Sequence, residues 1–259
     1  MSKTKTVLGW DAAWTPHGSG AWCVLRSAEV EGQLNELMVW EHTPGTQGET
    51  FNRLDQLLKE FSPDMIAIDM PVSKKAVTGY READRATTCA FSRYGCPVHS
   101  PTPERPGTWG EACMKVLFNK GYEIDTGKMV KRKAVAEVYP HTALLEILRL
   151  SYRLPYKITR HRQLWPEVTS QKSKQKCCEQ QQKILNRLGQ EIDINHWETP
   201  FPPLQPLSGL KAFEDRIDAL ICGWVGFQVL QRKFLAYGDD SSAIWNPDVN
   251  SLDPPKRTP

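Results

Sequence analysis

The sequence predicts a single α/β domain with a mixed sheet, in which an antiparallel three-strand meander precedes parallel strands and flanking helices. Short apolar runs of strand length alternate along the chain with segments whose apolar residues recur at helical spacing. Two of the runs, Val7–Trp14 and Met65–Met70, are almost continuously apolar but each carries an Asp. Runs of this kind are typical of strands buried on both faces, so helices are expected on both sides of the sheet.

The composition indicates a globular protein with a substantial core. The chain has 259 residues, of which 40% are hydrophobic, and it includes nine Trp. No apolar run approaches the roughly 18 residues of a membrane span, and the N-terminus leads into the first strand without a signal-peptide region. The seven cysteines are odd in number and irregularly spaced, unlike a secreted disulfide framework. We therefore expect a cytoplasmic protein with no membrane partner.

The first three strands are expected at Val7–Trp14, Ala21–Leu25 and Leu37–Trp40. The polar connections between them are short, which favours antiparallel neighbours. Asp11 lies inside the first run, where an ionised carboxylate without a partner would lose several kcal/mol of solvation. A cation, a cluster of donors or a metal ion is therefore expected beside Asp11.

An amphipathic helix and a parallel strand come next. Thr46 and Glu49 have the spacing of a capping box, and apolar residues recur at helical spacing from there to Phe61. The strand Met65–Met70 follows, and the intervening helix allows it to pair parallel with the first strand. Asp69 would then lie beside Asp11 at the same end of the sheet.

An insertion is expected over one end of the sheet, at about residues 72–130. It contains a predicted helix at about Tyr80–Phe91 and a Pro-rich loop at Pro97–Pro106. The strand Ala134–Tyr139 then resumes the sheet, and a short helix is expected after Pro140. Glu137 is a third acidic residue near the end of a strand.

The domain is expected to end with a long helix from Phe213 to about Leu235. Asp215 and Asp218 lie in its first turns, three residues apart, and are therefore neighbours on the helix surface. Residues 1–240 would form the domain, and residues 241–259 a polar, Pro-rich C-terminal tail with Trp245 as an anchor.

Positive charge is concentrated in one segment, although the net charge of the chain is only +3. Residues 151–190 contain nine Lys or Arg and two acidic residues, a local balance of +7. Such a segment can be the electrostatic footprint of a polyanion, or it can be a solvated connection between elements.

The order of elements and acids resembles the RNase H-like fold, and a set of motifs narrows the resemblance. The motifs are Gly9-Trp10-Asp11, Ile66-Ala67-Ile68-Asp69-Met70-Pro71, Arg81-x2-Asp84-x8-Arg93-x-Gly95, Glu137-Val138-Tyr139-Pro140, Lys157 and Asp215-x2-Asp218-Ala219. Together they are similar to a group of predicted RNase H-like nucleases, domain of unknown function 429. The last motif is also similar to the resolvase branch of the fold.

The resemblance implies a metal-dependent nuclease that acts on DNA or RNA. Asp11 would bridge two Mg²⁺ or Mn²⁺ ions, with Asp69 and Glu137 on one side and Asp218 or Asp215 on the other. This agrees with the chemistry of phosphodiester hydrolysis, in which divalent ions activate water and neutralise charge on the phosphoryl and leaving oxygens. The residues expected to bind substrate are Arg81, Arg85, Arg93, Lys157 and Arg160.

Two other functions remain open. A nucleotide-binding protein of the actin and sugar-kinase type shares the strand order, but such proteins usually have Gly two residues after the first Asp, where this chain has Ala13. A non-catalytic nucleic-acid-binding module could keep the acids for structure.

Local spacing suggests further interpretations of single residues. Arg81, Asp84 and Arg85 have the spacing of a surface ion-pair cluster, although Arg81 could also face a phosphate. Cys89 and Cys96 with His99 lack a fourth ligand at zinc-site spacing. The motifs of a serine hydrolase or a P-loop are missing from the sequence.

Overall fold

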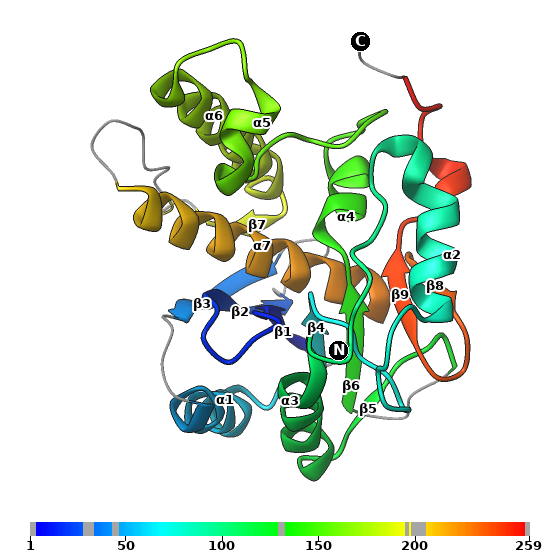
Figure 1. Cartoon of the computed structure of the whole chain (residues 1–259). Helices are drawn as coiled ribbons and strands as arrows, with labels where there is room; N and C mark the ends of the chain where they lie inside the picture. Colours follow the sequence, from blue (N-terminus) through cyan, green and yellow to red (C-terminus); the bar gives the residue numbers. More distant parts are fainter. Residues whose placement is uncertain are drawn as a thin grey trace.

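The computed structural model describes residues 4–27, 34–42, 47–128, 133–194, 197 and 206–256. These residues form a nine-stranded mixed sheet with helices on both faces (Figure 1). The strand order is β7-β3-β2-β1-β4-β6-β9-β8, and β5 pairs with β6 beside this path. In the described ranges no helix is long and apolar enough to cross a membrane.

The first three strands confirm the predicted meander. They are β1 (Thr6–Asp11), β2 (Gly20–Ser27) and β3 (Leu34–His42). Both pairings, β1 with β2 and β2 with β3, are antiparallel. The first strand is shorter than the apolar run that predicted it, so Asp11 is its last residue.

The centre of the sheet is parallel, as the strand–helix–strand order predicted. Helix α1 (Gln47–Phe61) leads to β4 (Met65–Ile68), which pairs parallel with β1. Strand β6 (Lys133–Val138) pairs parallel with β4 and aligns Glu137 with Ile68. The carboxyl ends of β1, β4 and β6 therefore lie at one edge of the sheet. Thr46 of the expected capping box lies outside the described residues.

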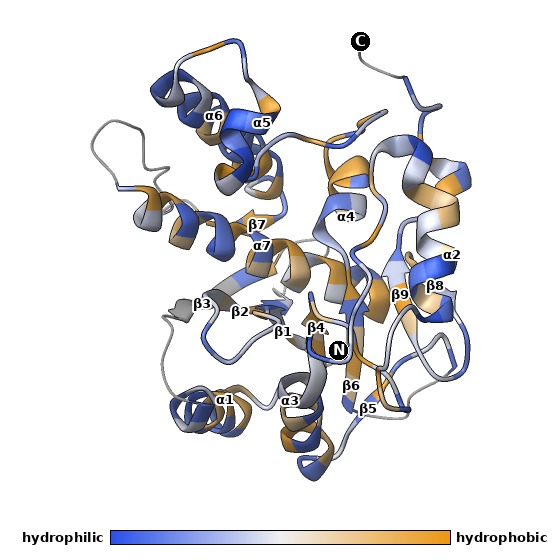
Figure 2. Cartoon of the chain, in the orientation of Figure 1, coloured by the Kyte–Doolittle hydropathy of each residue, from blue (hydrophilic) through white to orange (hydrophobic). Residues whose placement is uncertain are grey.

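Alternate residues of the central strands pack into two cores. Leu8, Trp10 and Ile68 point to the face that α1 and α3 (Gly107–Asn119) cover. Val7, Ala67 and their equivalents point to the face covered by three other helices. These helices are α4 (Pro140–Ile147), α6 (Ser170–Leu188) and α7 (Leu207–Leu230). Figure 2 shows mainly hydrophobic residues along β6, and hydrophobic residues mixed with hydrophilic ones along the covering helices α1, α3 and α6.

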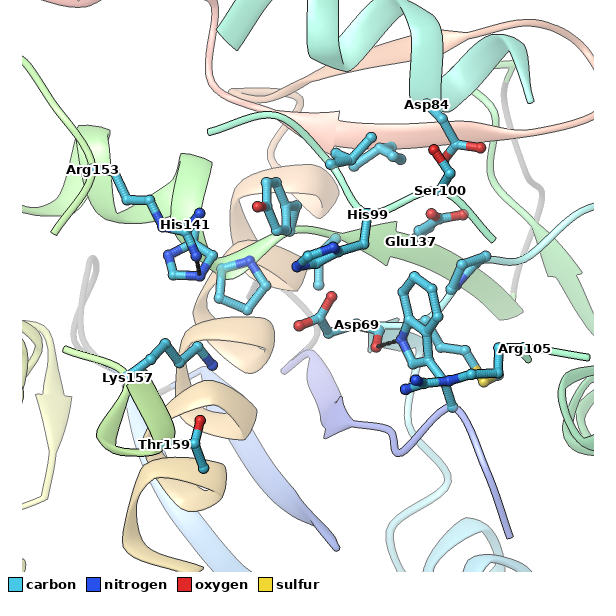
Figure 3. Close-up of a pocket in the computed structure, with 18 of the residues that line it drawn as sticks. Asp69, Asp84, His99, Ser100, Arg105, Glu137, His141, Arg153, Lys157 and Thr159 are labelled. Carbon is cyan, nitrogen blue, oxygen red and sulfur yellow. Dashed lines mark hydrogen bonds between the residues drawn. The ribbon is translucent and has the colours of Figure 1, made fainter. Parts of the chain in front are cut away.

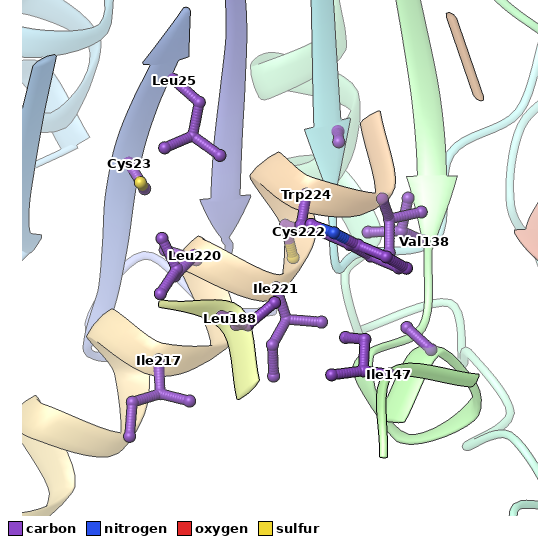
Figure 4. Packing of buried hydrophobic residues seen from close by; sticks show 14 of the residues in the cluster. Cys23, Leu25, Val138, Ile147, Leu188, Ile217, Leu220, Ile221, Cys222 and Trp224 are labelled. Carbon is purple, nitrogen blue, oxygen red and sulfur yellow. The ribbon is translucent and has the colours of Figure 1, made fainter. Parts of the chain in front are cut away.

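Helix α7 crosses the sheet at very close range because glycines meet at the crossing. A Cβ atom on Gly9 of β1 would lie 2.2 Å from the carbonyl oxygen of Ala219 and 2.4 Å from the nitrogen of Gly223. A Cβ on Gly223 would in turn lie 2.9 Å from Leu25. Leu25 and the α7 residues Leu220, Ile221 and Trp224 fill the surrounding core (Figure 4). This contact sets the distance between the end of β1 and the first turns of α7.

Three regions differ from the sequence predictions. The insertion contains α3 and β5 (Tyr122–Ile124) in addition to the expected helix α2 (Glu82–Phe91). The helix α7 begins earlier and ends earlier than expected. The boundary predicted at residue 240 falls inside a hairpin of β8 (Leu235–Gly238) and β9 (Ala243–Asn246), and β9 pairs with β6.

The basic segment is largely folded against the domain. It contains α5 (His161–Leu164) and the whole of α6, whose Cys177, Cys178 and Leu185 are buried. The elements that complete the chain are β7 (Ile192–Asp193) and the 3-10 helices η1 (Ser92–Tyr94), η2 (Ile158–Arg160) and η3 (Val249–Ser251).

Candidate metal centre and adjoining pocket

Three aspartates from two elements form an acidic cluster at the carboxyl end of β1. Asp11 ends β1, and Asp215 and Asp218 lie on one side of α7. Ligand oxygens of all three residues lie within 4.8 Å of one another. Asp215 and Asp218 are buried, whereas Asp11 is partly exposed. Among the acidic, His and Cys side chains of the described residues, these three aspartates are the group that is spaced closely enough to hold a metal ion.

Two lysines contact the cluster from different elements. Lys157 precedes η2 and forms an ion pair with Asp218, and its ammonium lies 3.7 Å from Glu214. Lys211 lies one turn before Asp215 on α7 and pairs with that residue and, at 3.1 Å, with Glu214. The four carboxylates of Asp11, Glu214, Asp215 and Asp218 are therefore accompanied by only two ammonium groups. The cluster has an excess of negative charge when all six groups are ionised.

The pKa shifts have the direction that this excess predicts. Burial, followed by the charges of Asp218 and Asp215, raises the pKa of Asp11 well above its usual value. Burial by itself would lower the pKa of Lys157, but Asp218 and the other neighbouring groups outweigh it and raise that pKa. Asp218 also accepts a hydrogen bond of 2.6 Å from the hydroxyl of Tyr156. The cluster thus favours additional cations.

Asp69 follows β4 and faces an adjoining pocket (Figure 3). Its backbone N–H donates to the carbonyl of Trp10 at 2.9 Å, and its carbonyl accepts the indole N–H of Trp14 at 3.3 Å. Its carboxylate accepts no hydrogen bond from any described residue. Burial is the main cause that raises the pKa of this carboxyl to about 7, and the Asp218 charge adds to it against the opposing effect of Lys157.

Glu137 pairs with Arg81 instead of joining the aspartate cluster. Its Oε2 accepts from Arg81 Nη1 at 2.7 Å and from the Val72 N–H at 2.8 Å, and its Oε1 accepts from Arg81 Nη2 at 2.6 Å. Arg81 also donates to both carboxylate oxygens of Asp84 and to the Val72 carbonyl. All five guanidinium N–H groups are therefore used within the protein.

This network corrects two expectations about Arg81. Its side chain is only 8% exposed and its partner Asp84 is buried, so the pair does not belong to a surface cluster. With every donor engaged, Arg81 has none left for a substrate phosphate. It holds α2 and the residues after β4 against the end of β6.

A pocket of about 600 Å³ opens beside Asp69 (Figure 3). Asp69 and His99 both line its central part, with Arg153 and His141 on one side in Figure 3 and Arg105 on the other. Its remaining cationic lining residues are Lys157, Arg160 and Lys211.

The other residues expected to bind substrate are divided between the pocket and the surface. Lys157 and Arg160 line the pocket. Arg85 instead forms an exposed ion pair with Glu82 at 2.5 Å, and Arg93 is exposed and lies over the ring of Tyr94.

The Cys89, Cys96 and His99 side chains do not form a metal-binding group among the described residues. The Cys96 thiol is directed to the carbonyls of Tyr94 and His141, and Cys89 is exposed.

Sequence reasoning missed the two residues that share the cluster's charge on α7. Lys211 and Glu214 precede Asp215 by four residues and one residue, and the i, i+4 spacing of Lys211 and Asp215 was a usable signal for the ion pair. His141 and Arg153 were missed because the pocket brings them together through tertiary contacts.

The fold and site define an α/β protein with an aspartate cluster beside a cationic pocket. The chain belongs to the family described as "Protein of unknown function (DUF429)", whose profile matches residues 9–241. That range contains every residue of the cluster. No match was found among curated proteins or among solved structures.

Proposed function

We propose that the protein is a metal-dependent phosphodiesterase of the RNase H-like type. The observation that carries the proposal is the convergence of Asp11, Asp215 and Asp218 within 4.8 Å at the edge of a cationic pocket. The antiparallel β3-β2-β1 meander with parallel β4 and β6 beside it is the arrangement that the resemblance to this fold implies. Nucleic acid is the proposed substrate class, because its phosphodiester carries the charge that the pocket's cations offset.

The residues present fit a hard divalent cation. Mg²⁺ and Mn²⁺ prefer carboxylate oxygens, and the cluster offers these without thiols. The Oδ2 atom of Asp215 is buried and has no hydrogen-bond partner, which leaves a ligand atom unused. The carboxylates of Asp11 and Asp69, two partly exposed residues, also accept no hydrogen bond from the described residues. Buried acceptors without donors are costly unless a cation or water binds them.

Asp11, Asp215 and Asp218 would hold the ion, and Asp69, which is outside this group, would face the substrate in the adjoining pocket. A bound divalent ion would supply charge neutralisation at the phosphoryl group and activation of water. Lys157 and Lys211 offset the carboxylate charge from the protein side. Glu137 would not bind the ion itself but would position Asp69, because its pairing with Arg81 fixes the ends of β4 and β6 around that residue.

The lysines also support a second candidate function, a nucleic-acid-binding module in which the acids are structural. In that case Lys157 and Lys211 would be the permanent partners of the aspartates. The nucleotide-binding alternative gains no support at position 13, where Ala stands in place of the Gly that would let the backbone approach a phosphate.

Calorimetry with Mn²⁺ and hydrolysis of bis(p-nitrophenyl) phosphate test the proposal together. We expect wild-type protein to bind the ion and cleave the ester, and Asp218→Asn to lose both. Asp253→Asn is the matched control, because it removes one exposed aspartate charge far from the cluster in sequence. Absence of metal binding in the wild type, with normal folding, would contradict the proposal.

A further inference from the structure

Three arginines of the pocket carry charge that the protein does not neutralise. Arg105, Arg153 and Arg160 all line the pocket, and none forms an ion pair with a carboxylate of the described residues. By contrast, Lys157 and Lys211 in the same lining are paired with acids. An anion is therefore the complement that the pocket lining lacks.

Burial, with neighbouring arginine charges as the second cause, lowers the pKa of two histidines in the pocket lining. Burial, and then Arg160, Arg153 and Arg105, lowers the pKa of His99. Burial and then Arg153 also lower the pKa of His141, which is 6% exposed. Because Arg153 can only donate, its contact of 2.6 Å with His141 Nε2 places the imidazole proton on Nδ1, which has no partner. His99 and His141 therefore line the pocket beside the arginines without adding a formal charge there.

The pocket has the size and lining of a site for one small molecule. Ligand pockets usually measure about 300–1,000 Å³, and this one measures about 600 Å³. Trp14 lines it with its indole N–H fixed on the Asp69 carbonyl, and Met70 and Val98 add apolar surface. An aromatic ring of this kind can stack on a nucleobase. In a duplex the bases are paired and stacked, so a base could enter only after leaving the helix.

We propose that the pocket binds one unpaired nucleotide unit, with its phosphate against Arg153, Arg160 and His99 and its base beside Trp14. This inference rests on the proposed function and specifies its substrate. The unit is a free mononucleotide or the end of a single strand, which share this chemistry. The phosphate would then lie in the part of the pocket lined by Arg153, Arg160 and His99, which also contains Asp69.

Calorimetric binding of thymidine 5′-monophosphate tests the site, in EDTA and in Mg²⁺. We expect Arg160→Gln to weaken binding about tenfold, as loss of a charge-assisted hydrogen bond does. Arg162→Gln is the matched control. Arg162 lies two residues after Arg160 and carries the same charge, but it does not line the pocket. Trp14→Leu should weaken binding of the nucleotide but not of inorganic phosphate. Equal losses from the two arginine variants, or no binding by the wild type, would overturn the inference.

Competition then identifies the source of the nucleotide. A 12-nucleotide strand with a 5′-phosphate that displaces the monophosphate indicates a strand end, and failure of that strand to compete indicates a free nucleotide. Competition by a blunt duplex as strong as by the single strand would overturn the inference. The metal titration described above remains a separate test, because it can fail while nucleotide binding in EDTA persists.

Discussion

Asp69 and Glu137 end neighbouring parallel strands, yet their carboxylates have different environments. Glu137 is neutralised by Arg81 and bonded by the Val72 N–H, whereas the Asp69 carboxylate accepts no hydrogen bond from the described residues. Position at a strand end predicted both residues as ligands of one metal. The partner of Glu137 lies 56 residues away in the sequence, so local spacing could not distinguish the two acids.

The raised pKa of Asp69 predicts a pH dependence of stability in metal-free protein. Because the folded-state pKa of about 7 lies above the usual value of 3.8, the group contributes its full stability below pH 3.8. That contribution is lost as the pH rises toward 7. We expect the melting temperature of the wild type in EDTA to fall between pH 5 and 7 relative to Asp69→Asn. Parallel melting curves for both proteins over this range would contradict the assignment.

Removal of the Arg81 side chain should be far more damaging than its spacing in the sequence suggests. Arg81→Met leaves the buried carboxylates of Asp84 and Glu137 without their partner, which should cost about 3–5 kcal/mol of unfolding free energy in urea titrations. Arg85→Met is the control on the same helix. Its pair with Glu82 is exposed to solvent and should contribute little to stability, so equal effects of the two substitutions would refute a buried network.

At the scale of elements, the crossing of β1 and α7 determines the geometry of the site. Gly9 and Gly223 allow the strand and helix backbones to approach closely, which places Asp11 beside Asp215 and Asp218. The spacing of the two α7 aspartates was visible in the sequence. Their approach to Asp11 was not, because it depends on a glycine contact between segments more than 200 residues apart.

A methyl group at this crossing should disturb both stability and metal binding. In Gly9→Ala the new Cβ would overlap the backbone of Ala219 and Gly223, which cannot move as a flexible side chain can. We expect a loss of about 1–3 kcal/mol or more, and a weaker rise of melting temperature with Mn²⁺. Gly79→Ala adds a methyl group where no atom lies within 4 Å, and it should leave both measurements near wild type. A Gly9→Ala protein with unchanged metal response would show that the crossing does not position the site.

At the scale of the whole molecule, the sequence predicted the central sheet better than its borders. Apolar runs and an intervening helix were sufficient for β1, β4 and their parallel pairing. Strand β9 has only four residues and follows polar ones, so the C-terminal region resembled a tail although β9 pairs with β6. The buried face of α6 was not predicted, because residues 151–190 are rich in charge and only one face of that helix packs on the core.

The response of Asp11→Asn to metal ions is the most direct test of a metal site in this protein. Asp11 has a raised pKa and neighbours of like charge, so the substitution should leave the metal-free melting temperature unchanged or higher. At an Mn²⁺ concentration of about 100 times the Kd, the wild type should gain about 2.7 kcal/mol, or roughly 5–10 °C, and the variant almost none. A wild-type melting temperature that is indifferent to Mn²⁺, together with an Asp11→Asn protein that melts several degrees lower, would show that the aspartates are structural and contradict the account.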